Sequence, residues 1–395
     1  MSERSPGRTV LGDRAVRFQA LAGLTAQVTQ GAGGIGIILV VRQHVGSLAV
    51  AGAVLGALSI AAAAARPLQG RVIDAGGGAG LMALCGLVHP GALAAIVGLS
   101  LAHAPGAALI ALGAVAGLAL PPVSTAMRVA WGERFPSEER TAAYSLVYLT
   151  QELSILAGPL LLSGLIVLAS ASVALLGVAA VSAAGTLAFA ASIAAPAPSR
   201  RPRREEGGRG RGVLRSTGMP ALLAIAALVG GVVGGLEVAT PVFASEHGAP
   251  ALSGVLIALL SVGGIAGAVT YASRTWSAPP ARRLPALLAL LAGAAILMIP
   301  AGSAWLVGAL MLLCGVSLNP ALTTLSLLVE RRAPPGAAAE GFGWLSTGFA
   351  GGTGAASAIA GLVAHHGHGA RSAFVVAAAA GLAAALLAVA ARARK

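Results

Sequence analysis

Long apolar stretches, separated by short polar segments rich in arginine, recur along the whole chain of 395 residues. A helix needs about 20 residues to cross the hydrocarbon core of a bilayer, so each apolar stretch of this size predicts a membrane-spanning helix. The pattern predicts an all-α membrane protein with twelve such helices, over residues 18–41, 48–65, 79–101, 106–128, 142–168, 172–194, 219–244, 251–272, 284–300, 304–328, 342–363 and 372–391.

The segment 195–218 stands apart because it is rich in Pro, Gly and Arg and has no apolar periodicity. Such a composition is typical of a polar linker. Six predicted helices precede it and six follow it. We therefore expect two six-helix bundles, residues 1–194 and 219–395, joined by a basic linker over residues 195–218.

An internal repeat supports this division. The segment GLALPPVSTAMRVAWGERFP (117–136) aligns with GVSLNPALTTLSLLVERRAP (315–334), so that Gly117, Pro122 and Pro136 fall on Gly315, Pro320 and Pro334. Repeats of this kind are the sequence signature of pseudo-symmetric halves. In transporters built from such halves, the substrate site lies between them.

Composition and charge agree with a membrane protein and indicate its orientation. Hydrophobic residues make up 57% of the chain and charged residues 10%, whereas soluble domains carry about 25% charged residues. All but two of the 26 basic residues, Arg42 and Arg371, lie in the N-terminus, in every second loop or in the C-terminus. The positive-inside rule then predicts that both termini are cytoplasmic. A nucleic-acid partner is not expected, because a soluble basic domain with stacking aromatics is missing.

Two of the thirteen acidic residues, Glu152 and Glu237, fall inside predicted spans. A charge at the bilayer centre costs roughly 2.5 to 3.5 kcal/mol, and no Lys or Arg lies deep in a predicted span to offset it. An apolar environment favours the protonated form of a carboxyl group, so we expect both residues to couple transport to protons. The alternative for Glu237 is a structural glutamate that is hydrogen-bonded between packed helices.

The sequence around Glu237 predicts close helix packing. Four glycines at i, i+4 spacing place bare backbone on two adjacent stripes of one helix, which lets neighbouring helices approach. They are Gly230, Gly231, Gly234 and Gly235. Pro241 follows Glu237 by one turn and is expected to hinge the outer end of this helix.

Polar side chains within the predicted spans are candidates for substrate binding. They are Gln27, Gln30, Tyr144, Tyr148, Gln151, Asn319 and Thr323. A cavity with acidic and no basic residues favours a cationic or neutral organic substrate over an anion. Such polar residues also bridge helices without touching a substrate, and this alternative stays open for each of them.

At this point the chain resembles the major facilitator superfamily over essentially its whole length. That family carries a loop motif that reads G-x-x-x-D-R-x-G-R-K, and the segment GRVIDAGGGAG keeps its glycine and aspartate as Gly70 and Asp74 but lacks the basic residues that follow. The resemblance implies that Asp74, with Arg71 and Arg128 nearby, gates the two halves. It also implies that helices one, two, four, five, seven, eight, ten and eleven line the cavity.

The pair Gly158-Pro159 resembles part of the motif of drug and proton antiporters in this family. A Gly-Pro pair kinks a membrane helix. The resemblance is partial, since the arginine that antiporters place in helix four is missing from residues 106–126. It implies a monomeric bacterial inner-membrane transporter that exports a small cationic or neutral molecule by proton antiport. Proton-coupled uptake, a non-transporting scaffold or receptor, and an intramembrane enzyme are the alternatives.

No cofactor, metal centre or enzymatic site is expected from the remaining motifs. Cys85 and Cys314 lie within apolar spans in opposite halves and are expected to be small core residues. The cluster HHGHG at residues 365–369 is expected to bind metal only adventitiously. Expected partners are therefore the small-molecule substrate, protons and the lipid bilayer.

Overall fold

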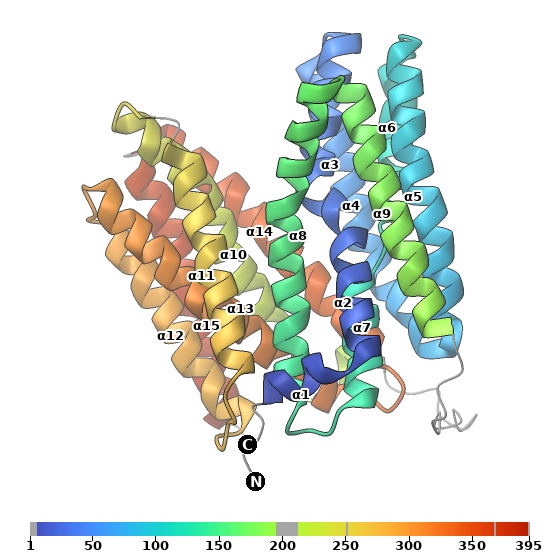
Figure 1. The fold of residues 1–395 in the computed structure, drawn as a ribbon. Helices are drawn as coiled ribbons and strands as arrows, with labels where there is room; N and C mark the ends of the chain where they lie inside the picture. Colours follow the sequence, from blue (N-terminus) through green and yellow to red (C-terminus); the bar gives the residue numbers. More distant parts are fainter. Residues whose placement is uncertain (1–5, 195–211, 250–251, 367–368, 394–395) are drawn as a thin grey trace. The chain divides into compact units, whose positions relative to one another are not determined.

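The computed structural model describes residues 6–194, 212–249, 252–366 and 369–393, and within these ranges it is all-helical, with no strand (Figure 1). The first nine helices are α1 (Pro6–Gly12), α2 (Arg14–Ala26), α3 (Val28–Val45), α4 (Leu48–Val72), α5 (Gly78–Leu101), α6 (Gly106–Leu118), α7 (Val123–Arg134), α8 (Arg140–Leu168) and α9 (Ala171–Ala194). The others are α10 (Met219–Glu246), α11 (Leu252–Ala272), α12 (Pro280–Met298), α13 (Ala304–Arg332), α14 (Ala338–His366) and α15 (Ala370–Ala393). A π-helical turn, η1 (Ile73–Gly77), and a 3-10 turn, η2 (Val213–Arg215), complete the set.

Eleven stretches of the described chain are long and apolar enough to cross a membrane. One of them, Ala49–Leu101, has 53 residues, which is long enough for two crossings at 1.5 Å per residue. Gly76 interrupts it with φ 87°, in the left-handed region that glycine adopts without strain. The eleven stretches therefore agree with the twelve predicted spans.

Several helices run beyond the apolar stretches that predicted them. Helix α4 ends at Val72 rather than residue 65, and α14 begins at Ala338 rather than residue 342. The physical reason is that hydropathy measures the apolar part of a helix, whereas backbone hydrogen bonding continues into the polar ends. Gly70 and Arg71 consequently lie in the last turn of α4, and not in a loop after it as we expected.

The predicted span 106–128 is broken into α6 and α7. Pro121 and Pro122 lie between the two helices, and neither has an N–H to donate to a carbonyl one turn earlier. Backbone carbonyls near the break therefore need other donors. The break was not expected, because both prolines lie within a continuous apolar stretch.

Three buried or half-buried side chains supply those donors. His89 Nδ1 lies 2.8 Å from the carbonyl oxygen of Ala116, and since a carbonyl only accepts, this nitrogen carries the hydrogen. Gln69 Nε2 donates to the carbonyls of Leu118 at 3.0 Å and Leu120 at 3.2 Å. Arg66 Nη1 also donates to Leu120 at 3.3 Å. His89 is 2% exposed, so its ring is packed inside the protein.

The described residues form two compact units, which we call the α2–α9 unit and the α10–α15 unit. The α2–α9 unit comprises residues 11–134 and 150–194, and the α10–α15 unit comprises residues 6–10, 135–149 and the chain from residue 212 onward. Helix α8 thus contributes its first ten residues to one unit and the rest to the other. The domain boundary at residues 195–218 stays a prediction, and residues 195–211 lie outside the described residues.

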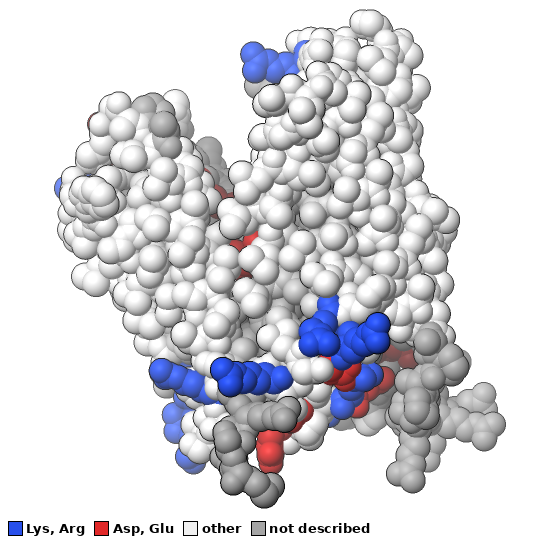
Figure 2. Space-filling model, in the orientation of Figure 1, with Lys and Arg blue, Asp and Glu red and all other residues white. Residues whose placement is uncertain are grey.

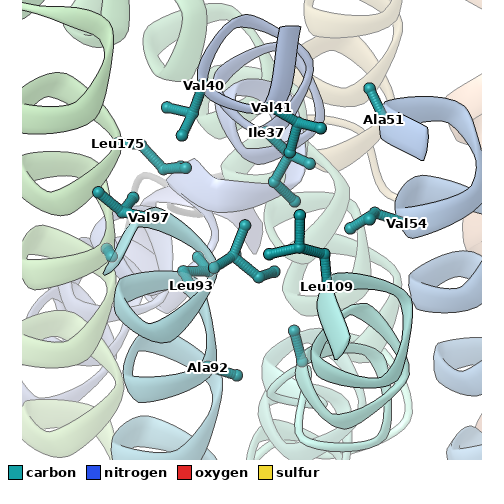
Figure 3. Packing of buried hydrophobic residues seen from close by; sticks show 13 residues of the cluster. Ile37, Val40, Val41, Ala51, Val54, Ala92, Leu93, Val97, Leu109 and Leu175 are labelled. Carbon is teal, nitrogen blue, oxygen red and sulfur yellow. The ribbon is translucent and has the colours of Figure 1, made fainter. Parts of the chain in front are cut away.

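The core of the α2–α9 unit is aliphatic. Ile37 of α3 points toward Leu93 of α5 and Leu109 of α6 (Figure 3), and Val40 and Val41 of α3 belong to the same buried cluster. All five side chains have no exposed surface. Fully burying one such side chain contributes about 1.5 to 3 kcal/mol in water, and inside a bilayer the same close fit acts through packing contacts.

Two glycines that the internal repeat relates allow close helix packing, one in each unit. A Cβ on Gly117 of α6 would collide with the carbonyl oxygen of Leu58 in α4, and one on Gly315 of α13 would collide with that of Leu260 in α11. Only a glycine permits this close approach of two backbones. The predicted correspondence between Gly117 and Gly315 therefore coincides with equivalent packing, whereas Pro320 lies in an unbroken α13.

Candidate functional site

Glu237 lies in α10 and is exposed, although it is surrounded along the helix by apolar residues. It forms no hydrogen bond or ion pair with any residue of the described ranges. Leu236 before it and Ala239 after it are buried. The helix is therefore held on its other faces and presents this carboxyl group outward.

The glycines that precede Glu237 hold α10 against two neighbours, as the sequence predicted. A Cβ on Gly230 or Gly234 would collide with the backbone of α14 at Phe349 or Thr353. On the adjacent stripe, Gly231 and Gly235 lie against α15. Hydroxyl groups of α14 add hydrogen bonds to this contact: Thr353 donates to the Gly230 carbonyl at 3.1 Å, and Ser357 to that of Gly234 at 3.2 Å. The position of Glu237 is fixed by this packing.

Glu152 and Gln151 lie in the part of α8 that belongs to the α2–α9 unit, and both are half-buried. The Gln151 Oε1 atom is buried and accepts no hydrogen bond from a described residue. Burying an amide oxygen without a hydrogen-bond donor costs about 1 to 3 kcal/mol of stability. This oxygen is thus available to a donor other than the described residues.

The first ten residues of α8 lie against α13 within the α10–α15 unit. Ser145 Oγ lies 3.4 Å from Thr323 Oγ1, and the Tyr148 hydroxyl lies 3.0 Å from Ser326 Oγ. Ser145, Thr323 and Ser326 have no exposed surface, and Tyr148 is 7% exposed. Three of the predicted substrate residues, Tyr144, Tyr148 and Thr323, are therefore buried side by side with two serines that the prediction omitted.

An ion pair and an aromatic pair extend this contact. Arg140 Nη1 lies 2.9 Å from Glu330 Oε1, and the rings of Tyr144 and Phe342 meet edge to face with centroids 5.9 Å apart. Ser145 and Ser326 are one and three residues from predicted site residues. Their closeness in sequence to those residues could have predicted that they belong to the same contact. A serine within a membrane span, however, does not by itself indicate a functional site. Asn319, 2% exposed, lies one turn before Thr323 on α13.

The two glutamines of the first span lie at a joint between α2 and α3. Gln27 is 1% exposed, donates to the Gly23 carbonyl at 2.9 Å and accepts from Ser124 Oγ at 2.8 Å. Gln30 is exposed and its amide nitrogen lies 3.4 Å from Gln27 Oε1. Gln27 therefore ties this joint to the start of α7, and Gln30 is the more accessible of the two.

The segment GRVIDAGGGAG, which keeps only the glycine and aspartate of the family's loop motif, begins at the end of α4 and runs through the turn η1. Gly70 is buried, Arg71 is exposed, and Asp74 is half-buried in η1. Arg128, in α7, is 3% exposed, so it lies within the α2–α9 unit and not at a surface. The gating role of these four residues stays a prediction.

The Gly158-Pro159 pair is a packing contact between α8 and α3. A Cβ on Gly158 would lie 2.5 Å from the Val28 carbonyl oxygen, and one on Gly31 would lie 3.1 Å from the Pro159 ring. Helix α8 continues through Pro159, and α10 likewise continues through Pro241. Pro159 lies inside α8 (Arg140–Leu168), and Pro241 lies in the second-last turn of α10 (Met219–Glu246).

The sixteen predicted site residues divide between the two units. Glu237, Tyr144, Tyr148, Asn319, Thr323 and Pro241 belong to the α10–α15 unit, and Glu152, Gln27, Gln30, Gln151, Gly70, Arg71, Asp74, Arg128, Gly158 and Pro159 belong to the α2–α9 unit. Within the described ranges, no three His, Cys, Asp or Glu side chains group closely enough to hold a metal ion. Residues 367 and 368 of the HHGHG cluster lie outside those ranges.

Charged side chains gather near the ends of helices. In Figure 2 most blue and red atoms lie at the end where α1 and α7 are drawn in Figure 1, and the sides are almost entirely white. An apolar belt with charges confined to its edges is the surface that a bilayer requires. The chain is thus a multi-pass membrane protein.

Comparisons with known proteins place this geometry in a family. The chain is similar to the structure of a bacterial homologue of the iron transporter ferroportin in an outward-facing state, with TM-score 0.75 and 17% identity over 96% of this chain and 99% of that one. It is similar to the human organic anion transporter MFSD10, with TM-score 0.70 and 18% identity over 98% and 100% of the two chains. It is also similar to FucP in the outward conformation, with TM-score 0.68 and 14% identity over 95% of this chain and 97% of that one.

These identities are too low to carry more than the fold. No curated protein matches the sequence. The family model of the Major Facilitator Superfamily, however, matches residues 20–356, which is most of the chain. The protein belongs to the Major Facilitator Superfamily of membrane transporters.

Proposed function

We propose that this protein exports a small cationic or neutral organic molecule in exchange for protons. The observation that carries the proposal is Glu237, a lone exposed carboxyl group in an apolar helix, without a partner among the described residues. In such surroundings a carboxyl group favours its protonated form, and contact with water lets it ionise. A group of this kind can take up and release one proton per cycle.

The proposed architecture is two pseudo-symmetric six-helix bundles with both termini in the cytoplasm of a bacterial inner membrane. The equivalent packing of Gly117 and Gly315 supports the symmetry, and the distribution of arginine supports the orientation. The protein acts as a monomer, since a facilitator of this size contains both halves of the substrate site in one chain.

In the proposed cycle, Glu237 and Glu152 take up protons when the cavity opens outward and release them when it opens inward. The deprotonated cavity then accepts the substrate from the cytoplasmic side. Acidic side chains attract cations and repel anions, which favours a cationic or neutral molecule as the cargo. Gln30, Gln151 and Asn319 contribute hydrogen bonds to it.

The α8–α13 contact supplies the reversible part of this cycle. The polar pairs Ser145–Thr323 and Tyr148–Ser326 and the ion pair Arg140–Glu330 are modest interactions, each worth about 0.5 to 1.5 kcal/mol. Interactions of that size separate readily when the first ten residues of α8 shift against α13 during the cycle. Arg71, Asp74 and Arg128 are proposed to bias the same transition.

Proton-coupled uptake is the second candidate function. The same carboxyl group serves either direction, and a structural neighbour is the E. coli fucose:proton symporter FucP. A non-transporting scaffold or receptor would need neither glutamate. The direction of transport and its coupling to protons are therefore tested in one experiment.

The experiment uses the full chain in liposomes with an imposed pH gradient and two probes, ethidium as a cation and fucose as a neutral sugar. Export by antiport requires ethidium to accumulate in vesicles that are acidic inside, against its own gradient, when the outward face of the protein lies inside. Glu237→Gln abolishes gradient-driven accumulation but leaves downhill exchange intact. Glu138→Gln, in an exposed connection, is the matched control and retains full activity.

Three results would contradict the proposal in different ways. Equal accumulation by wild type and Glu237→Gln would remove this residue from coupling. Accumulation of fucose together with protons would favour uptake. The absence of flux for a panel of cations and neutral solutes, with no effect of either glutamate on binding, would leave a scaffold or receptor.

A further inference from the structure

Arg283 is a buried cation in the first turn of α12. It is 8% exposed, and its Cζ atom lies 5.3 Å from the ring centroid of Tyr271 and 5.2 Å from that of Trp276. Its Nη1 atom donates to the Tyr271 hydroxyl at 2.7 Å. The guanidinium group therefore lies between aromatic faces and one hydroxyl, which stabilise a cation.

The hydrogen bonds around Arg283 run in one direction. The Thr324 hydroxyl donates to the Pro320 carbonyl at 2.7 Å, so it accepts from the Tyr271 hydroxyl at 2.8 Å, and Tyr271 in turn accepts from Arg283. No carboxylate enters this chain. Arg283 forms no ion pair with a described residue, and its Nε atom is buried without a hydrogen-bond partner. A buried charge in this condition is strongly unfavourable unless an anion compensates it.

The surroundings of Arg283 add positive charge instead of compensating it. Residues 271–283 contain Arg274, Arg282 and Arg283 and no Asp or Glu. Arg282 and Arg283 lie at the N-terminus of a 19-residue helix, where the helix dipole already favours an anion. Arg331, in the last turn of α13, is a further basic residue on the helix that hydrogen-bonds the Tyr271 hydroxyl. Glu330 beside it is engaged by Arg140.

We propose that the end of α11, the connection 273–279 and the first turn of α12 bind the phosphate group of an anionic phospholipid. The residues that carry this site are Arg274, Arg282, Arg283 and Trp276, and none of them takes part in the transport cycle proposed above. We call this set the phosphate site. It needs an anion for electrostatic reasons, and its position at the end of two membrane spans puts it at the level of the lipid headgroups.

The four residues divide the work of binding. Arg274 and Arg282 are exposed and supply accessible donors for phosphate oxygens, which guanidinium groups bind in bidentate fashion. Trp276 is 37% exposed and donates its Nε1 hydrogen to the Tyr271 carbonyl at 3.0 Å. Its ring thereby stays at the interface, as tryptophan prefers, and covers the buried charge of Arg283. Basic pockets between spans are a recognised setting for anionic headgroups.

The first test measures thermal stability of the full chain in a neutral detergent with added phosphatidylglycerol, phosphatidylcholine or inorganic phosphate. Phosphatidylglycerol is expected to raise the melting temperature, and the other two are not. In the double variant Arg274→Gln/Arg282→Gln, the half-saturating lipid concentration is expected to rise about 25-fold, or about fivefold per arginine. Arg371→Gln, an exposed arginine on α15, is the control and is expected to behave as wild type.

The outcomes separate the possible sources of phosphate. Equal stabilisation by inorganic phosphate and by phosphatidylglycerol would overturn the lipid assignment. Equal lipid dependence in wild type and in the double variant would overturn the site itself. Neither result bears on coupling through Glu237, so the transport proposal stands or falls separately.

A second measurement works without removing any arginine. In nanodiscs, brominated phosphatidylglycerol is expected to quench the fluorescence contributed by Trp276, obtained as wild type minus Trp276→Phe, more strongly than brominated phosphatidylcholine at the same mole fraction. Trp305→Phe, which removes a tryptophan that is 91% exposed, defines quenching by bulk lipid. Equal quenching of Trp276 by the two lipids would show that no anionic headgroup is held there.

Discussion

The Thr353 hydroxyl donates a hydrogen bond to the Gly230 carbonyl across a helix contact so close that Gly230 has no room for a Cβ. The contact joins α14 to α10 one to two turns before Glu237. It therefore sets the position of the carboxyl group that we propose as the proton carrier. Packing of bare backbone, rather than side-chain interdigitation, is the main interaction here.

Gly230→Ala is expected to destabilise the protein by about 1 to 3 kcal/mol, because the added methyl group must displace the backbone of α14. Gly354→Ala is the matched control, since nothing lies within 4 Å of its Cβ position. It is expected to be neutral or up to about 1 kcal/mol stabilising, as alanine favours a helix. Thermal unfolding in detergent measures both. Equal effects of the two substitutions would show that α14 does not approach α10 this closely.

The ion pair Arg140–Glu330 is expected to contribute about 1 kcal/mol, because both side chains are partly screened from water. Arg140→Gln and Glu330→Gln should each lower stability, and the double variant should lose less than the sum of the two. The coupling free energy from this double-mutant cycle is the measurement. Strict additivity would indicate that the two charges do not interact in solution.

His89→Ala is expected to cost about 1 to 3 kcal/mol, since it leaves the Ala116 carbonyl without a donor inside the membrane span. His89→Gln restores a donor on a flexible side chain and should recover part of the loss. Hydrogen exchange of the amides around residues 116–124 reads out the helix break directly. Unchanged exchange in His89→Ala would mean that another group satisfies this carbonyl.

Asp13 is expected to make the stability of the folded protein depend on pH. Partial burial raises the pKa of its carboxyl group, but hydrogen bonds from Arg134 and from the Ala15 backbone N–H outweigh this, so that the pKa lies below its ordinary value of 3.8. Because the carboxyl group has a lower pKa in the folded state than in the unfolded state, its ionised form stabilises the fold. This contribution to stability is complete above the unfolded-state pKa of about 3.9. This stability is lost as the pH falls through the folded pKa.

Asp13→Asn is therefore expected to lower the melting temperature at pH 7 and to have progressively less effect below about pH 4. Melting curves of wild type and variant between pH 7 and pH 3 measure the difference. Glu138→Gln, which removes an exposed carboxylate, should show no such trend. A constant difference between Asp13→Asn and wild type down to pH 3 would exclude the Asp13–Arg134 interaction as its source.

The sequence by itself determined the number and order of the membrane spans, because lipid requires about 20 consecutive apolar residues for each crossing. It also determined the two glycine stripes of α10, since i, i+4 spacing places residues on one helical face whatever lies opposite. Equivalent glycines at positions 117 and 315 were visible for the same reason. These features are local or periodic, so they can be derived without knowledge of neighbours.

Only the tertiary structure decided which polar groups find partners. Gln27 accepts from Ser124, Tyr148 meets Ser326, and Arg283 reaches Tyr271, each across a sequence separation that no helical period encodes. The break at Pro121 and Pro122 is tolerated because Gln69 and His89 come from other helices to satisfy its carbonyls. A hydrogen bond depends on distance and direction between two elements, and helix packing alone sets both.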